Sequence, residues 1–145
     1  MVLLAKDIME YAFLTVDEET SAYDCARQMV DQHKGYAVVS RTNKPYGIVT
    51  EWDYLSKIVA LGADPHTVKV REIASQVMHS CTPETPTDQV VSQMASHGIR
   101  RMVVRSGDQV VGIITSRMVL QRFREYIDKV SSEIAGYQSA STTLG

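Results

Sequence analysis

The sequence has few of the features that mark specialised classes of protein. Its two cysteines, Cys25 and Cys81, have no CxxC spacing, which argues against a zinc site or a disulfide framework. It contains no apolar run of 18 residues, so it predicts no membrane span. It also contains no glycine-rich phosphate loop, no recognisable Ser/His/Asp or Cys/His motif and no metal-ligand cluster. We therefore expect a protein that is not an enzyme, holds no metal and requires no cofactor.

Neither sign of charge predominates. The formal net charge of −2 argues against a general coat for nucleic acid, although a local basic patch is compatible with it. The first seven residues are too short and too soon charged for a signal peptide, so we expect a cytoplasmic protein. With 145 residues, of which 44% are hydrophobic and 22% charged, the chain can build an adequate core without metal or disulfide staples.

Sliding the chain along itself by 65 positions reveals an internal repeat. Eleven identities fall over some fifty positions without a gap, where chance gives roughly three at ordinary residue frequencies. The identical pairs are Ile8/Ile73, Glu19/Glu84, Thr20/Thr85, Gln28/Gln93, Met29/Met94, Val38/Val103, Val39/Val104, Gly47/Gly112, Ile48/Ile113, Thr50/Thr115 and Leu55/Leu120. We interpret the chain as a tandem repeat of one structural unit.

Both copies predict the same order of elements. A lead-in helix or turn (6–11 and 71–76) precedes a short strand (14–16 and 79–81), a helix from Thr20 or Thr85, a β-hairpin (36–50 and 102–115) and a closing helix (51–61 and 116–134). Apolar residues at helical spacing, including Cys25, support the first helix and predict a buried thiol. Pro86 directly after Thr85 is typical of a helix start.

We therefore expect an α+β fold of two pseudo-symmetric β-α-β-β-α units, at residues 5–62 and 71–134, joined by a linker at 63–70. A single unit would leave one sheet face and one helix stripe uncovered. The two units should thus pack sheet to sheet as one domain with a pseudo-twofold axis. The second closing helix is extended, and the small, polar tail at 135–145 is predicted to be disordered.

Two motifs within this repeat resemble those of the CBS domain family, whose tandem pairs form the Bateman module. The motifs are the segment 98–104 (GIRRMVV) before the second hairpin and the segment 47–53 (GIVTEWD) after the first. The resemblance covers about residues 5 to 130. It implies a regulatory or sensor module without catalysis, which binds an adenosine-containing ligand such as AMP, ADP or ATP in a cleft between the units. It also implies a homodimer.

The resemblance assigns one cleft to residues from both copies. Thr50 and Asp53 would hold phosphate and ribose, with Ile48 beside them. The second copy would contribute adenine contacts and, through arginine, a phosphate contact. These second-copy residues are Val77, Met78, His79, Ile99, Arg100 and Arg101. The single tryptophan, Trp52, is expected at the mouth of this cleft, where its fluorescence could report binding.

The same residues also fit simpler roles, which the sequence leaves open. Thr50 and Asp53 have the spacing of a capping box at a helix start. Arg100 and Arg101 could be a solvated surface pair. His79 has no second ligand at metal spacing, so it is not expected to bind a metal.

The opposite cleft would use Thr115, Arg117, Phe13 and Lys34. Here Met118 replaces the carboxylate of Asp53, and a methionine cannot accept hydrogen bonds from a ribose diol. We therefore predict a weaker cleft.

An alternative function is an interaction scaffold with vestigial nucleotide sites, which would bind an effector protein or a nucleic acid. Six arginines make the second copy the more basic part: Arg100, Arg101, Arg105, Arg117, Arg122 and Arg124.

Overall fold

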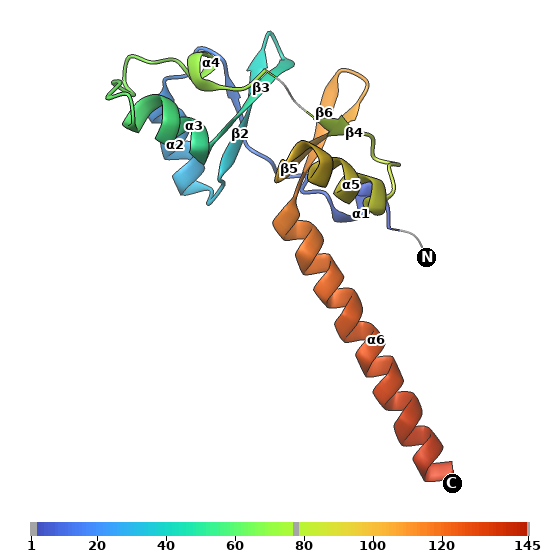
Figure 1. Ribbon diagram of the computed structural model, residues 1–145. Helices are drawn as coiled ribbons and strands as arrows, with labels where there is room; N and C mark the ends of the chain where they lie inside the picture. Colours follow the sequence, from blue (N-terminus) through green and yellow to red (C-terminus); the bar gives the residue numbers. More distant parts are fainter. Residues whose placement is uncertain (1–2, 77–78, 145) are drawn as a thin grey trace.

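The computed structural model describes residues 3–76 and 79–144, and it contains two three-stranded sheets with the strand orders β1-β2-β3 and β4-β5-β6 (Figure 1). The first half contains α1 (Ala5–Ile8), β1 (Thr15–Asp17), α2 (Ala22–Asp31), β2 (Tyr36–Arg41), β3 (Lys44–Thr50), α3 (Glu51–Tyr54) and the π-helical η1 (Leu55–Val59). The second half contains α4 (Val70–Ile73), β4 (Ser80–Cys81), α5 (Thr87–His97), β5 (Arg101–Ser106), β6 (Gln109–Thr115) and α6 (Ser116–Leu144). The α+β prediction is confirmed.

The two sheets have the same topology, as expected from the repeat. In each sheet the short first strand pairs parallel with the middle strand, and a hairpin pairs the middle strand antiparallel with the third. Even the irregularity in register recurs, between Val39 and Ser40 and between Val104 and Arg105. The recurrence follows from similar residues at equivalent positions of the two hairpins.

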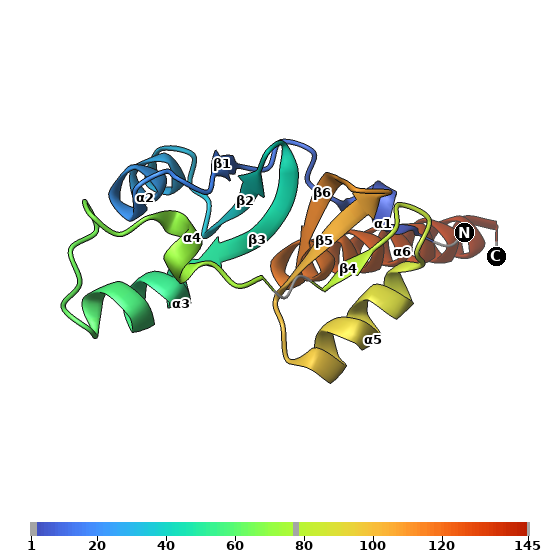
Figure 2. The ribbon, with the colours of Figure 1, turned by 90° about the horizontal axis from the view of Figure 1, so that it is seen from above.

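Alternation along the strands divides the core into layers. In β2, Ala37 and Val39 pack under α2, whereas Tyr36 and Val38 face the other unit. The layer between the sheets also contains Val103 and Ile113 from the second unit. Figure 2 shows the two units side by side with β3 next to the second sheet. The predicted sheet-to-sheet packing is therefore present.

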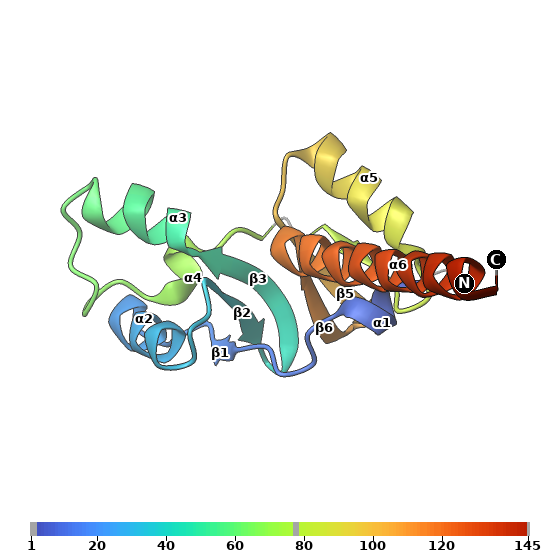
Figure 3. The ribbon, with the colours of Figure 1, turned by 90° about the horizontal axis from the view of Figure 1, so that it is seen from below.

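The lead-in helices are exchanged between the units. Ala5, Ile8 and Met9, from α1 and the residue after it, are buried in the core of the second unit. Conversely, Val70 and Ile73 of α4 are buried in the core of the first unit. Figure 3 shows α1 beside β6 and α4 beside α2 and β3. Each unit is thus completed by the segment that precedes the other unit in the sequence.

The starts of both main helices and the end of the last helix differ from the prediction. The helix predicted from Thr85 begins at Thr87, with Pro86 and not Thr85 at the cap position. The first helix begins one residue after Ser21, whose hydroxyl oxygen accepts a hydrogen bond of 3.0 Å from the Asp24 N–H, so Ser21 and not Thr20 is the cap. The prediction of a disordered tail from residue 135 is wrong, because α6 continues to Leu144. No proline interrupts this segment, and the single Gly136 does not stop the helix.

No helix within residues 3–76 and 79–144 combines the length and the apolar character that crossing a bilayer would require.

Candidate functional site

A cavity of about 630 Å³ opens between the two units. It lies where β3 runs into α3 and where the connection from α5 to β5 comes opposite. The predicted residues among its lining are Ile48, Thr50, Asp53, His79, Ile99, Arg100 and Arg101. The predicted residues Val77 and Met78 lie outside the described part of the chain. The structure thus brings residues of both copies together, as the predicted cross-copy arrangement requires.

Asp53 is the buried carboxylate of this cavity, with 7% of its surface exposed. Its Oδ2 accepts hydrogen bonds from the Thr50 N–H at 2.8 Å and the Thr50 hydroxyl at 3.3 Å. Its Oδ1 accepts one from Lys57 Nζ at 3.0 Å. Asp53 and Thr50 therefore cap the start of α3, as the simpler interpretation of the sequence predicts. A carboxylate has about four lone-pair sites, so these bonds leave capacity for further donors.

Lys57 connects Asp53 to a segment of the second copy. Its Nζ donates to the carbonyl oxygen of Ile73 at 2.8 Å, as well as to Asp53. The lysine thereby ties the helix that carries Asp53 to α4, the lead-in helix of the second copy. Lys57 thereby also places a positive charge beside the nearly buried carboxylate of Asp53.

Arg101 is held by Glu51, a cavity residue that the sequence did not predict. The guanidinium Nη2 donates to Glu51 Oε1 at 2.8 Å, and this ion pair packs against Gly35, where a Cβ atom would overlap both partners. The Arg101 guanidinium also lies 5.9 Å from the Tyr36 ring. Burial raises the pKa of Tyr36 to about 12, although Arg101 opposes this shift.

Arg100, in contrast, is exposed on the cavity wall, and no ion pair holds it among the described residues. The preceding Gly98 ends α5 with φ of 62°, a left-handed conformation that glycine adopts without strain. This turn places Ile99 and Arg100 opposite Thr50 and Asp53. Arg100 is thus a cation of the cavity that remains free for an anionic ligand.

Four further lining residues were not among the predicted site residues: Leu55, Ser75, Gly98 and Val103. Ser75 lies here because its backbone exchanges two hydrogen bonds of 2.9 Å with Ile48. His79 stacks on His97, with ring centroids 4.1 Å apart. Trp52 lines the cavity with 68% of its surface exposed.

The residues of the predicted weaker cleft have separate surroundings. Phe13 packs into the layer between the sheets, and Thr115 Oγ1 accepts a hydrogen bond of 3.2 Å from the Met118 N–H. Arg117 is exposed at the start of α6. Lys34 forms an ion pair with Glu10 and lines a different cavity of about 570 Å³, beside α2 and α3.

Glu10 was not among the residues predicted for this second cleft. It exchanges backbone hydrogen bonds with Ile113, at 2.8 and 3.1 Å, just as Ser75 does with Ile48. The repeat therefore places a carboxylate where the first cavity has a serine. Glu10 thus neutralises Lys34, one of the two cations of the predicted weaker cleft.

The fold and the cavity define a module of two pseudo-symmetric units with a ligand-sized space between them. The family model of the CBS domain matches both units, at residues 5–60 and 70–125. The chain belongs to the CBS domain family, as a tandem pair of the kind that serves as a regulatory module.

Similar proteins include a solved structure and longer relatives. The hexameric CBS-CP12 protein from bloom-forming cyanobacteria superimposes with a TM-score of 0.77 and 33% identity, over 83% of this chain and 67% of that one. The uncharacterized protein MK0525 of Methanopyrus kandleri is 28% identical over 127 residues, 86% of this chain and 65% of the relative. An L-aspartate semialdehyde sulfurtransferase of Methanosarcina acetivorans is 31% identical over 117 residues, 79% of this chain and 23% of the enzyme. This chain thus spans under two thirds of these two relatives.

Proposed function

We propose that this tandem pair is a regulatory module that binds an adenosine nucleotide (AMP, ADP or ATP) in the cavity built on Thr50 and Asp53. The observation that carries the proposal is the convergence of a buried carboxylate and a free arginine from different copies on one cavity. The cavity volume of about 630 Å³ falls within the usual range for small-molecule sites.

Each part of the nucleotide has a suitable partner in the lining. Ile48, Ile99 and Val103 provide apolar surface for a base. Asp53 can accept hydrogen bonds from a ribose diol, the use that acidic residues have in dinucleotide sites. Arg100 can pair with phosphate, because a planar guanidinium matches phosphate oxygens in a bidentate way.

Binding without catalysis is part of the proposal. The sulfurtransferase relative shares only a quarter of its length with this chain, so the likeness supplies no argument for its activity here. Among the described residues no cluster of three or more His, Cys, Asp or Glu side chains is placed to hold a metal ion.

The alternative of a nucleic-acid scaffold has less support. Of the six arginines that suggested the scaffold, two are engaged within the chain, since Arg101 pairs with Glu51 and Arg122 with Glu125. An electrophoretic shift of RNA or DNA that weakens with salt would favour the scaffold over the nucleotide module.

Calorimetric titration with AMP, ADP and ATP tests the proposal. We expect at least one of them to bind with a Kd below about 1 mM, which corresponds to roughly −4 kcal/mol. Asp53→Ala should weaken that binding tenfold or more, and Arg100→Ala should weaken binding of the more highly phosphorylated ligands most. If none of the three nucleotides binds in this range, the proposal is wrong.

Asp7→Ala is the matched control. Asp7 Oδ2 accepts a hydrogen bond of 2.8 Å from the Leu4 N–H, the same capping bond that Asp53 makes with Thr50, but Asp7 is not part of the cavity. Each variant should lose about 1 kcal/mol of stability through its cap. Only Asp53→Ala should lose affinity; equal affinities in the two variants would leave Asp53 with a capping role alone.

A further inference from the structure

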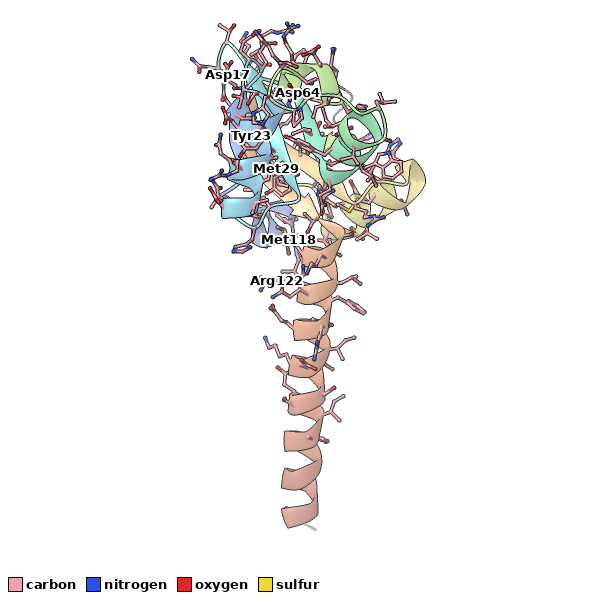
Figure 4. The ribbon with its side chains drawn as sticks, turned by 90° about the vertical axis from the view of Figure 1, so that its left-hand side faces the viewer. Asp17, Tyr23, Met29, Asp64, Met118 and Arg122 are labelled. Carbon is pink, nitrogen blue, oxygen red and sulfur yellow. The ribbon has the colours of Figure 1, made fainter. Side chains whose placement is uncertain are left out.

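The long helix α6 runs away from the rest of the molecule (Figure 1). Its first turns are attached: Val119 packs against the core of the second unit, and Arg122 donates to the carbonyl oxygen of Asp7 at 3.2 Å. Figure 4 shows the labelled Met118 and Arg122 where α6 leaves the body of the molecule. The rest of α6, which we call the shaft, projects beyond them. A helix that projects in this way needs another source of stability, because isolated helices are marginal in water.

Six of the seven large apolar residues between positions 120 and 137 follow a heptad pattern, and Tyr126 is the exception. Their spacing alternates between three and four residues, as at the a and d positions of a coiled coil. The six positions are Leu120, Phe123, Ile127, Val130, Ile134 and Tyr137. We call this row the α6 seam. A straight α-helix drifts by about 20° per heptad from such a row, so the repeat matches a second helix wound around the first.

The α6 seam is exposed in the single chain. The exposed fractions are 68% for Leu120, 59% for Phe123, 46% for Ile127, 51% for Ile134 and 75% for Tyr137. Since full burial of an aromatic side chain removes about 150–250 Å², the seam offers on the order of 500 Å² of apolar surface per copy. The aliphatic parts of the flanking charged side chains add to this apolar area. Together they approach the roughly 800 Å² that each partner buries in a stable interface.

The charges beside the seam favour another helix over a membrane surface. Between Leu120 and Tyr137 three cations are interspersed with three anions: Arg122, Arg124, Glu125, Asp128, Lys129 and Glu133. Helices that lie on membranes have instead a wide apolar face and a polar face rich in Lys and Arg. The seam is narrow, and no charged residue occupies an a or d position. When two copies of the same helix pair through such a row, the apolar residues of one copy face the same residues of the other.

We propose that residues 120–137 of α6 pair with the same segment of a second copy of this chain as a two-stranded coiled coil. The pairing buries the α6 seam of both copies and stabilises the projecting part of the helix. It leaves the cavity at Thr50 and Asp53 untouched, because that cavity lies in the body of the molecule.

Sedimentation equilibrium of the full chain, from about 1 to about 100 μM, tests this pairing. The wild-type mass should rise toward that of a dimer with concentration. Ile134→Glu and Ile127→Glu each place a charge in the seam and should raise the dissociation constant tenfold or more. Ala135→Glu is the matched control: it adds the same charge one residue along, on an exposed position outside the seam, and should leave the constant unchanged.

Two results would overturn the proposal. One is a wild-type chain that stays monomeric over the whole concentration range, which would indicate that the α6 seam binds a different partner. The other is equal association of Ile134→Glu and Ala135→Glu, which would place the contact between copies elsewhere. Both substitutions lie outside the hydrophobic cores, so near-wild-type urea midpoints should accompany either outcome.

Discussion

Gly47 sets how closely the two halves of the chain can approach. A Cβ atom at this position would overlap the carbonyl oxygen of Ser75, which is fixed in its hydrogen bonds with Ile48. The equivalent Gly112 faces the side chain of Met9, whose sulfur would lie 2.6 Å from an added Cβ. The same motif glycine therefore meets rigid backbone in one copy and a flexible side chain in the other.

This contrast predicts unequal costs of the same substitution. Gly47→Ala should lower the free energy of unfolding by about 2–3 kcal/mol, because backbone must move to relieve the overlap. Gly112→Ala should cost about 1 kcal/mol, because the thioether of Met9 can move aside. Urea denaturation of the two variants measures the difference. A larger loss for Gly112→Ala would contradict this account of the motif.

The first hairpin shows strain at the scale of an element. Its two-residue turn uses Thr42 and Asn43, with φ of 52° and 61°. Positive φ at both positions suits the right-handed twist of the strands, but a β-branched residue pays for this conformation. The second hairpin has Gly107 with φ of 61° at the corresponding turn, where no such cost arises.

Thr42→Asn should therefore stabilise the protein. Asparagine tolerates the left-handed conformation better than threonine, and we expect a gain of about 0.5–1 kcal/mol in the free energy of unfolding. Thermal or urea unfolding is the measurement. Asp108→Asn, in the turn of the other hairpin and without positive φ, is the control and should change little; an equal gain there would speak against relief of strain at Thr42.

At the scale of the whole molecule, the exchange of lead-in helices makes the two units one folding unit. Ile8 is 7% exposed in the core of the second unit, and Ile73 is 3% exposed in the core of the first. Loss of either side chain therefore weakens a core formed by two distant parts of the sequence.

We expect Ile8→Ala and Ile73→Ala each to lower the free energy of unfolding by about 2–4 kcal/mol. In both variants unfolding should remain a single cooperative transition, because neither unit keeps a complete core when the other unfolds. Fluorescence of Trp52 in the first unit and far-ultraviolet dichroism of the whole chain should report the same urea midpoint. Two separate midpoints would show that the units unfold independently.

Local patterns were enough to predict the elements and the repeat. Strand alternation, helix spacing and turn residues act over a few positions. The hairpins predicted at 36–50 and 102–115 could therefore be derived from their own residues, and the structure has them at 36–50 and 101–115. Comparison of the two copies also singled out Asp53 against Met118, and the structure places Asp53 in the cavity wall. Its part in binding remains a prediction.

The sequence by itself determined the duplicated α+β unit, because each copy carries its own periodicity and turns. Only the tertiary structure decided that α1 packs into the core of the second unit and α4 into the core of the first. The same holds for the ion pairs of Glu51 with Arg101 and of Glu10 with Lys34. Only the structure showed that α6 leaves the body with its seam exposed. These features depend on contacts between residues far apart in the chain, and such contacts leave no periodic trace in the sequence around either partner.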